Sequence, residues 1–276
     1  MENYTRKKII SQSNNIKAGI EFTGEEAKQN CTLQRSKSAD VPFTYKTGDI
    51  FLFQGISGNY SSVVAEKITG NKNINFNFVE CKDADGNYYA TVNIGTQVWM
   101  AENLKTTKYR NASSISYITD NDTWMNTKAG AWCNYNNEAV NSSKYGHIYN
   151  FYTLMDSRGF APVGWHIPNL TEWRTMITLL GDYSEAGGKL KESGTVNWKS
   201  PNIGATNLSG FTALPGGYRS RNGVYTFING YAYWWSSSTS SDGYSGQAFW
   251  INNEYTDIVP LYEPFISGLY IRCVKD

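Results

Sequence analysis

Hydrophobic and polar residues alternate in short runs over the first third of the chain, as they do in half-buried β-strands. Ile50-Phe51-Leu52-Phe53 is an apolar run behind a Gly-Asp turn, and residues 74–78 alternate strictly between apolar residues and asparagine. Ser57-Gly58-Asn59 between them is a turn signal, whereas the polar stretch 29–41 is typical of a loop. Residues 1–80 are therefore predicted to form a small, β-rich, sandwich-like domain.

Helical spacing of apolar residues follows later in the chain. An apolar residue recurs at i, i+3, i+4 and i+7 in the segments 148–155 and 173–180. The second segment has an N-cap candidate in Asn169, and Glu172 three residues later can complete a capping box. Gly181 can end this helix because glycine adopts the left-handed conformation without strain. We predict two helices, which carry Ile148, Phe151, Tyr152 and Met155 in the first and Trp173, Met176, Ile177 and Leu180 in the second.

Beyond residue 200 the helical periodicity disappears, and Asn-Gly or Asp-Gly pairs separate short aromatic runs. These dipeptides tolerate the positive φ that tight hairpin turns require. The pattern predicts an antiparallel β meander with the two helices packed against it, which is an α+β fold. The turn pairs of the meander are Asn222-Gly223, Asn229-Gly230 and Asp242-Gly243, and an earlier pair, Asp85-Gly86, predicts a hairpin between the strand that ends at Phe78-Val79 and the run 88–92.

Composition indicates a domain boundary and argues against one class of partner. The 276 residues carry a net charge of +1, which argues against nucleic acid as a partner. Aromatic residues make up 15% of the chain, and all nine tryptophans lie from Trp99 onward. This uneven distribution predicts a second domain over residues 81–276.

The compartment is suggested by composition and by the cysteines. No run of about 18 apolar residues could span a membrane, and no signal peptide is visible after Met1. The cysteines form no CxxC pair, so a zinc ribbon or a thioredoxin-type redox motif is not expected, and four cysteines allow three pairings. The chain is rich in Asn, Ser, Tyr and Gly, which is typical of secreted and surface proteins and predicts an extracytoplasmic location, at the cell surface or secreted.

Catalytic motifs are sparse. The chain has no phosphate-binding loop and no GxSxG nucleophile elbow. We expect His166, just before the second helix, to be a structural histidine that bonds a nearby backbone group. The spacing of the acidic residues selects no pair for glycoside hydrolysis. Those considered were Glu172, Glu185, Glu192, Glu254 and Asp257.

The segment 83–87 has alternating oxygen donors, like a calcium-binding loop. An EF-hand needs glycine at position six and glutamate at position twelve, but here glycine is at position four and Ile94 is at position twelve. Hairpin turn chemistry explains the segment better, with a calcium site of another type as the alternative. We predict no cofactor.

Aromatic residues supply the candidates for binding. Trp234-Trp235 could be a sugar-stacking platform, but we expect a core strand in which alternation buries one ring and leaves the other nearer the surface. Tyrosine and arginine at turns offer contact area with polar tips and suit a binding face, although ordinary strand-edge aromatics are the alternative. The predicted ligand-binding residues are Tyr218, Arg219, Arg221, Tyr225 and Tyr244.

Seven sequence blocks, in order, resemble the Fibrobacter succinogenes major paralogous domain family over roughly residues 81–276. Residues 1–80 are similar to the β-rich segment that precedes this domain in proteins of Bacteroidetes. The blocks are Asp83-Ala-Asp-Gly-Asn87, residues 94–107 with Trp99 and Asn103, Ala131-Trp-Cys-Asn-Tyr-Asn-Asn137, Ala161-Pro-Val-Gly-Trp-His-Ile-Pro168, residues 210–219 ending in Tyr218-Arg219, Trp234-Trp-Ser-Ser237 and Ile271-Arg-Cys-Val274.

The resemblance implies a C-type-lectin-like fold, shared with the formylglycine-generating enzyme group, in surface-exposed or secreted lipoproteins. Calcium-dependent lectins of this fold carry Glu-Pro-Asn and Trp-Asn-Asp motifs, but here Glu263-Pro264 precedes Phe265 and Trp235 precedes serine. Formylglycine generation needs a close pair of reactive cysteines, and Cys273 has no cysteine near it in sequence. The resemblance further implies a Cys133–Cys273 disulfide, with Cys31–Cys81 as the second bridge.

These inferences lead to one main function and its alternatives. We expect a non-catalytic cell-surface binding or adhesion module that recognises a glycan or an extracellular protein through loops of the C-type-lectin-like domain. No nucleic acid and no transmembrane span are expected, and a lipid anchor could lie upstream. The alternatives are an enzyme, either a formylglycine-generating-like oxidase or a glycan hydrolase, and a structural component of the cell surface.

Overall fold

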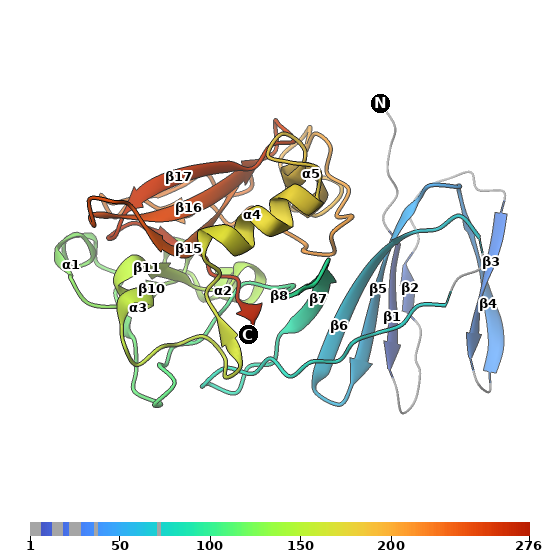
Figure 1. The fold of residues 1–276 in the computed structure, drawn as a ribbon, viewed down its shortest axis with the longest axis horizontal. Coiled ribbons are helices and arrows are strands. Elements are labelled where there is room, and N and C mark those ends of the chain that lie inside the picture. The colour runs from blue at the N-terminus through green and yellow to red at the C-terminus, as the bar shows by residue number, and fades with distance from the viewer. Residues whose placement is uncertain (1–6, 13–18, 22–28, 36–37, 71–72) are drawn as a thin grey trace.

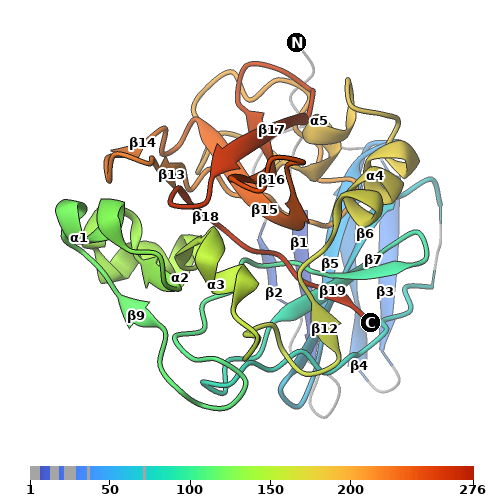
Figure 2. The same ribbon diagram turned by 60° about the vertical axis from the view of Figure 1, so that its left-hand side comes forward.

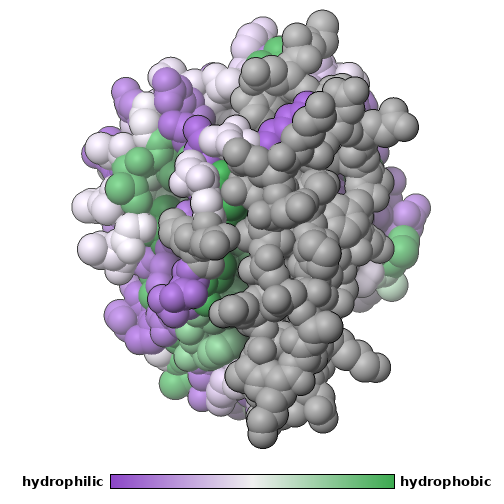
Figure 3. Space-filling view, turned by 90° about the vertical axis from the view of Figure 1, so that its right-hand side faces the viewer, coloured by the Kyte–Doolittle hydropathy of each residue, from purple (hydrophilic) through white to green (hydrophobic). Residues whose placement is uncertain are grey.

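The structure is a computed structural model that describes residues 7–12, 19–21, 29–35, 38–70 and 73–276, with side chains described from residue 46 onward. Strands dominate and the helices are short, so the architecture is mixed α+β, as predicted (Figure 1). The first strands lie at the right of Figure 1, and strands β7 and β8 lead from them into the rest of the chain. Figure 3 looks onto this N-terminal side, where the coloured atoms form adjoining hydrophobic and hydrophilic patches.

An eight-stranded sheet runs from the N-terminal strands into the later part of the chain. The β5–β6 hairpin turns at Gly58, which has a φ of 59°, and this confirms the predicted turn. β6 then pairs in parallel with β7, so strand pairing crosses the domain boundary expected near residue 80. The sheet contains β12 (Trp165–His166), β19 (Val274–Lys275), β8 (Gln97–Met100), β7 (Ala90–Ile94), β6 (Tyr60–Lys67), β5 (Ile50–Ser57), β1 (Lys7–Gln12) and β2 (Gly19–Glu21), in that order.

Two early segments differ from the prediction. Residues 29–35 and 38–41 are not a loop: they belong to the antiparallel pair β3 (Gln29–Arg35) and β4 (Ser38–Tyr45), and β4 alternates Ala39, Val41, Phe43 and Tyr45 with polar residues and proline. Residues 74–78 are not a strand, although their alternation has a physical basis. Ile74 and Phe76 pack on the buried Phe51 and Phe53 of β5, and a side chain at Gly55 would overlap the Phe76 ring.

Two further sheets form the later part of the chain. The longest strand, β15, is the first of an antiparallel β15–β16–β17 meander, as predicted. Figure 2 shows β13 and β14 beside this meander, with α3 below it. The meander contains β15 (Tyr231–Thr239), β16 (Ser245–Asn252) and β17 (Val259–Pro264), and the other sheet contains β14 (Tyr225–Thr226), β13 (Tyr218–Arg219), β18 (Gly268–Leu269), β11 (Ile148–Asn150), β10 (Ala131–Cys133) and β9 (Ser116–Tyr117).

One of the two predicted helices has the expected form. Asn169 caps it, its side chain and that of Glu172 form the capping box, and Gly181 follows with a φ of 99°. The other is shorter than predicted, because Ile148 belongs to a strand and the helix begins at Phe151. The helices are α1 (Asn121–Asn126), α2 (Ala139–Tyr145), α3 (Phe151–Met155), α4 (Leu170–Leu179) and α5 (Ala186–Leu190), with a 3-10 turn at Tyr135–Asn137.

Both faces of β15 are buried. Trp234 belongs to a core cluster with Trp99, Trp173 and Phe249, and Trp235 belongs to a second cluster on the opposite face. Neither ring is exposed, so the expectation that one of them lies nearer the surface is wrong. The strand is covered on two sides, which a two-residue alternation cannot reveal.

The cysteines are not paired as expected. Cys133 and Cys273 are free thiols in separate core clusters, so the Cys133–Cys273 disulfide is absent from the structure. Cys81 is also a free, buried thiol, and the side chain of Cys31 lies outside the described residues. Burial raises the thiol pKa of Cys133 and disfavours the reactive thiolate.

Candidate functional site: an aromatic surface

Five aromatic rings from the β13–β14 hairpin, the following loop and the meander pack side by side at one end of β15. The Tyr218 ring lies 4.5 Å from Tyr233 and 6.1 Å from Phe227, measured between ring centroids. Tyr231 continues the row, at 4.7 Å from Phe227 and 5.4 Å from Trp250. We call this set the aromatic surface, because Phe227 is 48% exposed and only Tyr233 is buried.

The loop between β14 and β15 holds Phe227 on this surface. Its backbone has a φ of 67°, which is unusual for a bulky residue, and Asn229 also has a positive φ. The carbonyl of Phe227 accepts hydrogen bonds from the amides of Gly230 and Tyr231, at 3.1 and 3.0 Å. Strained backbone of this kind is often found at binding sites, where the surrounding structure fixes it before the ligand arrives.

A carboxyl group lies at the edge of the aromatic surface. Burial raises the pKa of Glu263 on β17, although the Ser267 hydroxyl, which donates to it at 2.7 Å, and the positive charge of Arg221 act in the opposite direction. The Tyr218 pKa is raised by burial and then by the negative charge of Glu263. Glu263 therefore supplies a polar, hydrogen-bonding group beside the rings, and the positive charge of Arg221 acts on it.

The structure gives the predicted ligand-binding residues different roles. Tyr218 is part of the aromatic surface, and the charge of Arg221 acts on Glu263 beside it. Tyr225 is half-buried, and its hydroxyl donates to the Asn137 side chain at 2.7 Å. Tyr244 is 78% exposed in the turn at the other end of the β15–β16 ladder. The set of five is therefore not a single site.

Arg219 is a structural residue, contrary to the prediction. Its side chain is completely buried, and the guanidinium donates to backbone carbonyls in 118–120, to the carbonyl of Gly223 and to the side chain of Asn121. It also lies over the Trp124 ring at 4.3 Å. Because the side chain is buried, it cannot reach a ligand at the surface, and Arg219 instead ties β13 to the segment before α1.

Two other sequence candidates have structural partners. His166 bonds two carboxylates rather than a backbone group: Nδ1 lies 2.6 Å from Asp276 and Nε2 lies 2.7 Å from Glu172. The Asp83 carboxylate accepts the amides of Asp85 and Asn87, both at 2.9 Å, as a hairpin turn requires. Among the described residues, no three His, Cys, Asp or Glu side chains are grouped as metal ligands.

Two of the other acidic candidates for catalysis also have partners. Glu185 forms an ion pair with Lys189 at 2.9 Å. Glu192 accepts from the Asn197 side chain at 2.6 Å. The first interaction lies at the end of α5 and the second involves the buried Glu192, and neither carboxylate is part of the aromatic surface.

Sequence reasoning missed Phe227, Tyr231, Trp250 and Glu263. Tyr231 and Trp250 lie on neighbouring strands and on the same face as Tyr233, so strand alternation with the right register could have grouped them. Phe227 could not be found this way. Its contact with the surface depends on a positive φ, and a phenylalanine in the sequence gives no indication of such a backbone angle.

The aromatic surface can bind a molecule that has an apolar face and a polar rim. Its rings are held together by mutual packing, so little side-chain entropy is lost when a ligand covers them. The hydroxyls of Tyr218 and Tyr231 and the charges of Glu263 and Arg221 can form hydrogen bonds around that face. Sugar rings have this chemistry, with C–H groups on a face and hydroxyls at the edge.

An α+β domain with such a surface is a candidate binding domain. Comparison with known families identifies the family to which this domain belongs. The model of the Fibrobacter succinogenes major domain matches residues 92–275, and the chain belongs to this family. Searches of curated proteins and of solved structures find no match. No helix in the described part of the chain is long and apolar enough to cross a membrane.

Proposed function

We propose that this protein is a non-catalytic binding module that recognises a glycan at the aromatic surface. The observation that supports it best is the packed row of rings, with the partly exposed Phe227, Tyr231 and Trp250 beside Glu263 and Arg221. Flat aromatic faces cover the apolar face of a sugar, and the neighbouring polar groups select the hydroxyls around it.

The wider assignment is also a proposal. The composition and the family resemblance favour a cell-surface or secreted, adhesive protein with a C-type-lectin-like fold, and a lipid anchor encoded upstream. Cell-surface exposure can be measured by treating intact producing cells with a protease. Loss of the protein from intact cells supports the location, and protection until lysis contradicts it.

The binding proposal is tested by a glycan array, followed by isothermal titration with the best oligosaccharide. Tyr231→Ala and Phe227→Asn are the test variants, and asparagine is chosen because it tolerates the left-handed backbone at position 227. Each is expected to weaken binding by about tenfold or more, since each removes a ring from the contact surface.

Tyr244→Ala is the matched control, because Tyr244 is an exposed tyrosine far along the same ladder. It is expected to bind like the wild type. Equal loss in the control and the test variants, or no binding on the array, contradicts the proposal. Hydrolysis of the bound oligosaccharide would favour the enzyme alternative.

A further inference from the structure

A buried lysine lies where α5, the loop that follows it and the meander meet. Lys191 is the C-cap residue of α5, and its side chain is completely buried. The nitrogen Nζ donates to three backbone carbonyls, those of Ile203 at 2.7 Å, Tyr255 at 2.8 Å and Asn252 at 2.9 Å. A lysine ammonium has three donors, so each of its hydrogens has an acceptor here.

The Lys191 side chain is positively charged at pH 7. Burial lowers its pKa from 10.5 to about 8, while the negative charge of Asp257 acts in the opposite direction. Hydrogen bonds to the three carbonyls also favour the charged form. Removal of the ammonium would leave these buried carbonyls without their donor, which is unfavourable at each of them.

Two of the three carbonyls belong to the last residue of β16 and the turn after it. Asn252 pairs with Tyr231 in the β15–β16 ladder. The amide of the next residue, Asn253, donates to the Gly230 carbonyl at 3.0 Å. The Gly230 amide donates in turn to the Phe227 carbonyl at 3.1 Å. A short chain of backbone hydrogen bonds therefore joins the buried ammonium to the loop that presents two rings of the aromatic surface.

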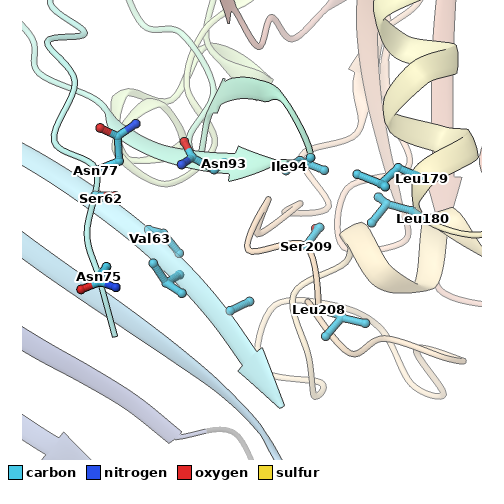
Figure 4. Close-up of a pocket in the computed structure, with 13 residues that line it drawn as sticks. Ser62, Val63, Asn75, Asn77, Asn93, Ile94, Leu179, Leu180, Leu208 and Ser209 are labelled. Carbon is cyan, nitrogen blue, oxygen red and sulfur yellow. The ribbon is translucent and has the colours of Figure 1, made fainter. Parts of the chain in front are cut away.

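The third carbonyl belongs to the long loop between α5 and β13. The Ile203 amide of this loop donates to the Asn253 carbonyl at 2.9 Å. At the far end of the loop, the Ser209 amide donates to the Lys189 carbonyl of α5 at 3.2 Å. This far end has different surroundings, because Leu208 and Ser209 line a groove of about 340 Å³ beside β6 (Figure 4). The ammonium thus holds the first part of the loop, and the α5 backbone holds the far end.

We propose that Lys191 is a positioning residue for the aromatic surface. Its buried ammonium holds the turn after β16, and through that turn it holds Phe227 and Tyr231 in the conformation that receives a ligand. The effect on affinity rests on the proposed binding function, whereas the effect on the loop needs no ligand. Phe227 has a left-handed backbone, which persists only where the surrounding structure fixes it. Rings that are already positioned lose less conformational entropy on binding.

The variant Lys191→Met tests this role, because methionine is unbranched and similar in length but has no donor. Amide hydrogen exchange at pH 7 measures the result without a ligand. Protection of the Gly230, Tyr231 and Asn253 amides is expected to fall by about tenfold or more, since these amides belong to the hydrogen-bonded chain. The Ser209 amide, at the groove end of the neighbouring loop, should keep its protection.

Lys189→Met is the matched control. This lysine lies on the same helix, but its ammonium donates to the Leu180 carbonyl and to Glu185. The control should leave exchange at 230, 231 and 253 unchanged. Unchanged exchange at these amides in Lys191→Met overturns the proposal. So does an equal loss of protection at Ser209, which would mean that the whole domain is destabilised.

Binding is measured separately, by isothermal titration with the best oligosaccharide from the glycan array. Lys191→Met is expected to weaken binding by about threefold or more, and Lys189→Met should not weaken it. Faster exchange in the loop without loss of affinity overturns the link between Lys191 and the binding site. If the wild type binds no glycan, the proposed function fails, and the exchange result alone supports or overturns the role of Lys191 in holding the loop.

The wild type provides the test if Lys191→Met does not fold. Reductive methylation labels accessible amines, so Lys191 should react only when its surroundings open. Its labelling should depend on denaturant concentration as exchange of the Gly230 amide does. Lys189, whose side chain is 29% exposed, should react without such opening. Equal labelling rates for the two lysines, or different denaturant dependences for Lys191 and Gly230, overturn the proposal.

Discussion

At the scale of single residues, a few buried polar side chains join segments that are distant in sequence. The Asn103 Oδ1 atom accepts from the Trp234 indole at 2.9 Å and from Arg272 Nε at 2.7 Å. Arg272 also donates to the carbonyls of Met100 and Phe211, at 3.0 and 2.5 Å. Four of the family blocks therefore meet at one hydrogen-bonded node, which explains why these blocks carry polar residues at buried positions.

Arg272→Lys is expected to lower the free energy of unfolding by about 3 kcal/mol. A lysine ammonium cannot reproduce the planar fork, and it leaves buried carbonyls and the Asn103 oxygen without donors. Urea denaturation measures the change. Arg158→Lys is the control, because Arg158 makes an exposed pair with Asp156 and its replacement should change stability by less than about 0.5 kcal/mol. If Arg272→Lys lowers the free energy of unfolding by no more than Arg158→Lys does, the structural role of this hydrogen-bonded node is refuted.

His147 should make the protein less stable in mild acid. Burial lowers its pKa from 6.5 to about 4 in the folded state, where the ring packs on Trp132 at 4.1 Å and Nδ1 bonds Asn134. The unfolded chain binds the proton first, so stability falls by about 3 kcal/mol at most as the pH drops from 6.5 through 4. Unfolding of His147→Gln, followed from pH 7 to 4, should lack this loss. An unchanged slope in the variant would show that other groups cause it.

At the scale of elements, His166 joins the last strand to a helix. It lies on β12, while Glu172 belongs to the first turn of α4 and Asp276 follows β19. Burial acts to lower the His166 pKa, but the hydrogen bonds with Asp276 and Glu172 outweigh it, so the pKa is raised. The protonated ring thus holds two carboxylates together.

The His166 contribution to stability should depend on pH in the sense opposite to that of His147. A raised pKa in the folded state means that the stabilisation is complete below the unfolded value near 6.5 and is lost as the pH rises through the folded value. His166→Gln should therefore destabilise the protein more at pH 6 than at pH 9. Thermal unfolding at both pH values tests this. An equal loss of stability at pH 6 and pH 9 would show that the protonated His166 ring does not stabilise the fold through its two carboxylates. The effect should also shrink in high salt, because the site is partly exposed.

Elements with local signals were predictable from the sequence, and those that depend on distant partners were not. Asn169, Glu172 and Gly181 mark the two ends of α4 and lie within thirteen residues of sequence. Arg219 was expected at the surface because the carbonyls that bury it come from residues about 100 positions away. Tyr218 was found and Phe227 was missed for the same reason: one lies on a strand with a readable pattern, and the other depends on an unusual backbone angle.

At the scale of the whole molecule, the eight-stranded sheet joins the N-terminal strands to the family domain. Val63 of β6 pairs with Val92 of β7, and a side chain at Gly210 would overlap Val92. The two predicted domains therefore share a packed junction, while the match to the family begins only at residue 92.

A chain that starts at residue 81 should be less stable than one that starts at residue 46. The longer chain keeps β6 beside β7, whereas the shorter one exposes the β7 edge and the apolar surface around Val92. We expect its Tm to be lower by about 5 °C or more, with a tendency to self-associate. Calorimetry and size-exclusion chromatography measure both properties. Equal Tm values and two monomeric chains would show that the junction adds nothing.

The confinement of tryptophan to one part of the chain gives this protein a built-in optical label. Indole fluorescence reports only on the region from Trp99 onward, where seven of the rings are fully buried, while Trp132 and Trp250 are partly exposed. The N-terminal strands are silent to this probe and visible to far-ultraviolet circular dichroism. Superimposable melting curves by the two methods would mean one cooperative unit, and separate curves would mean two. A sugar that covers Trp250 would also change the emission, so the same instrument can follow binding without an added dye.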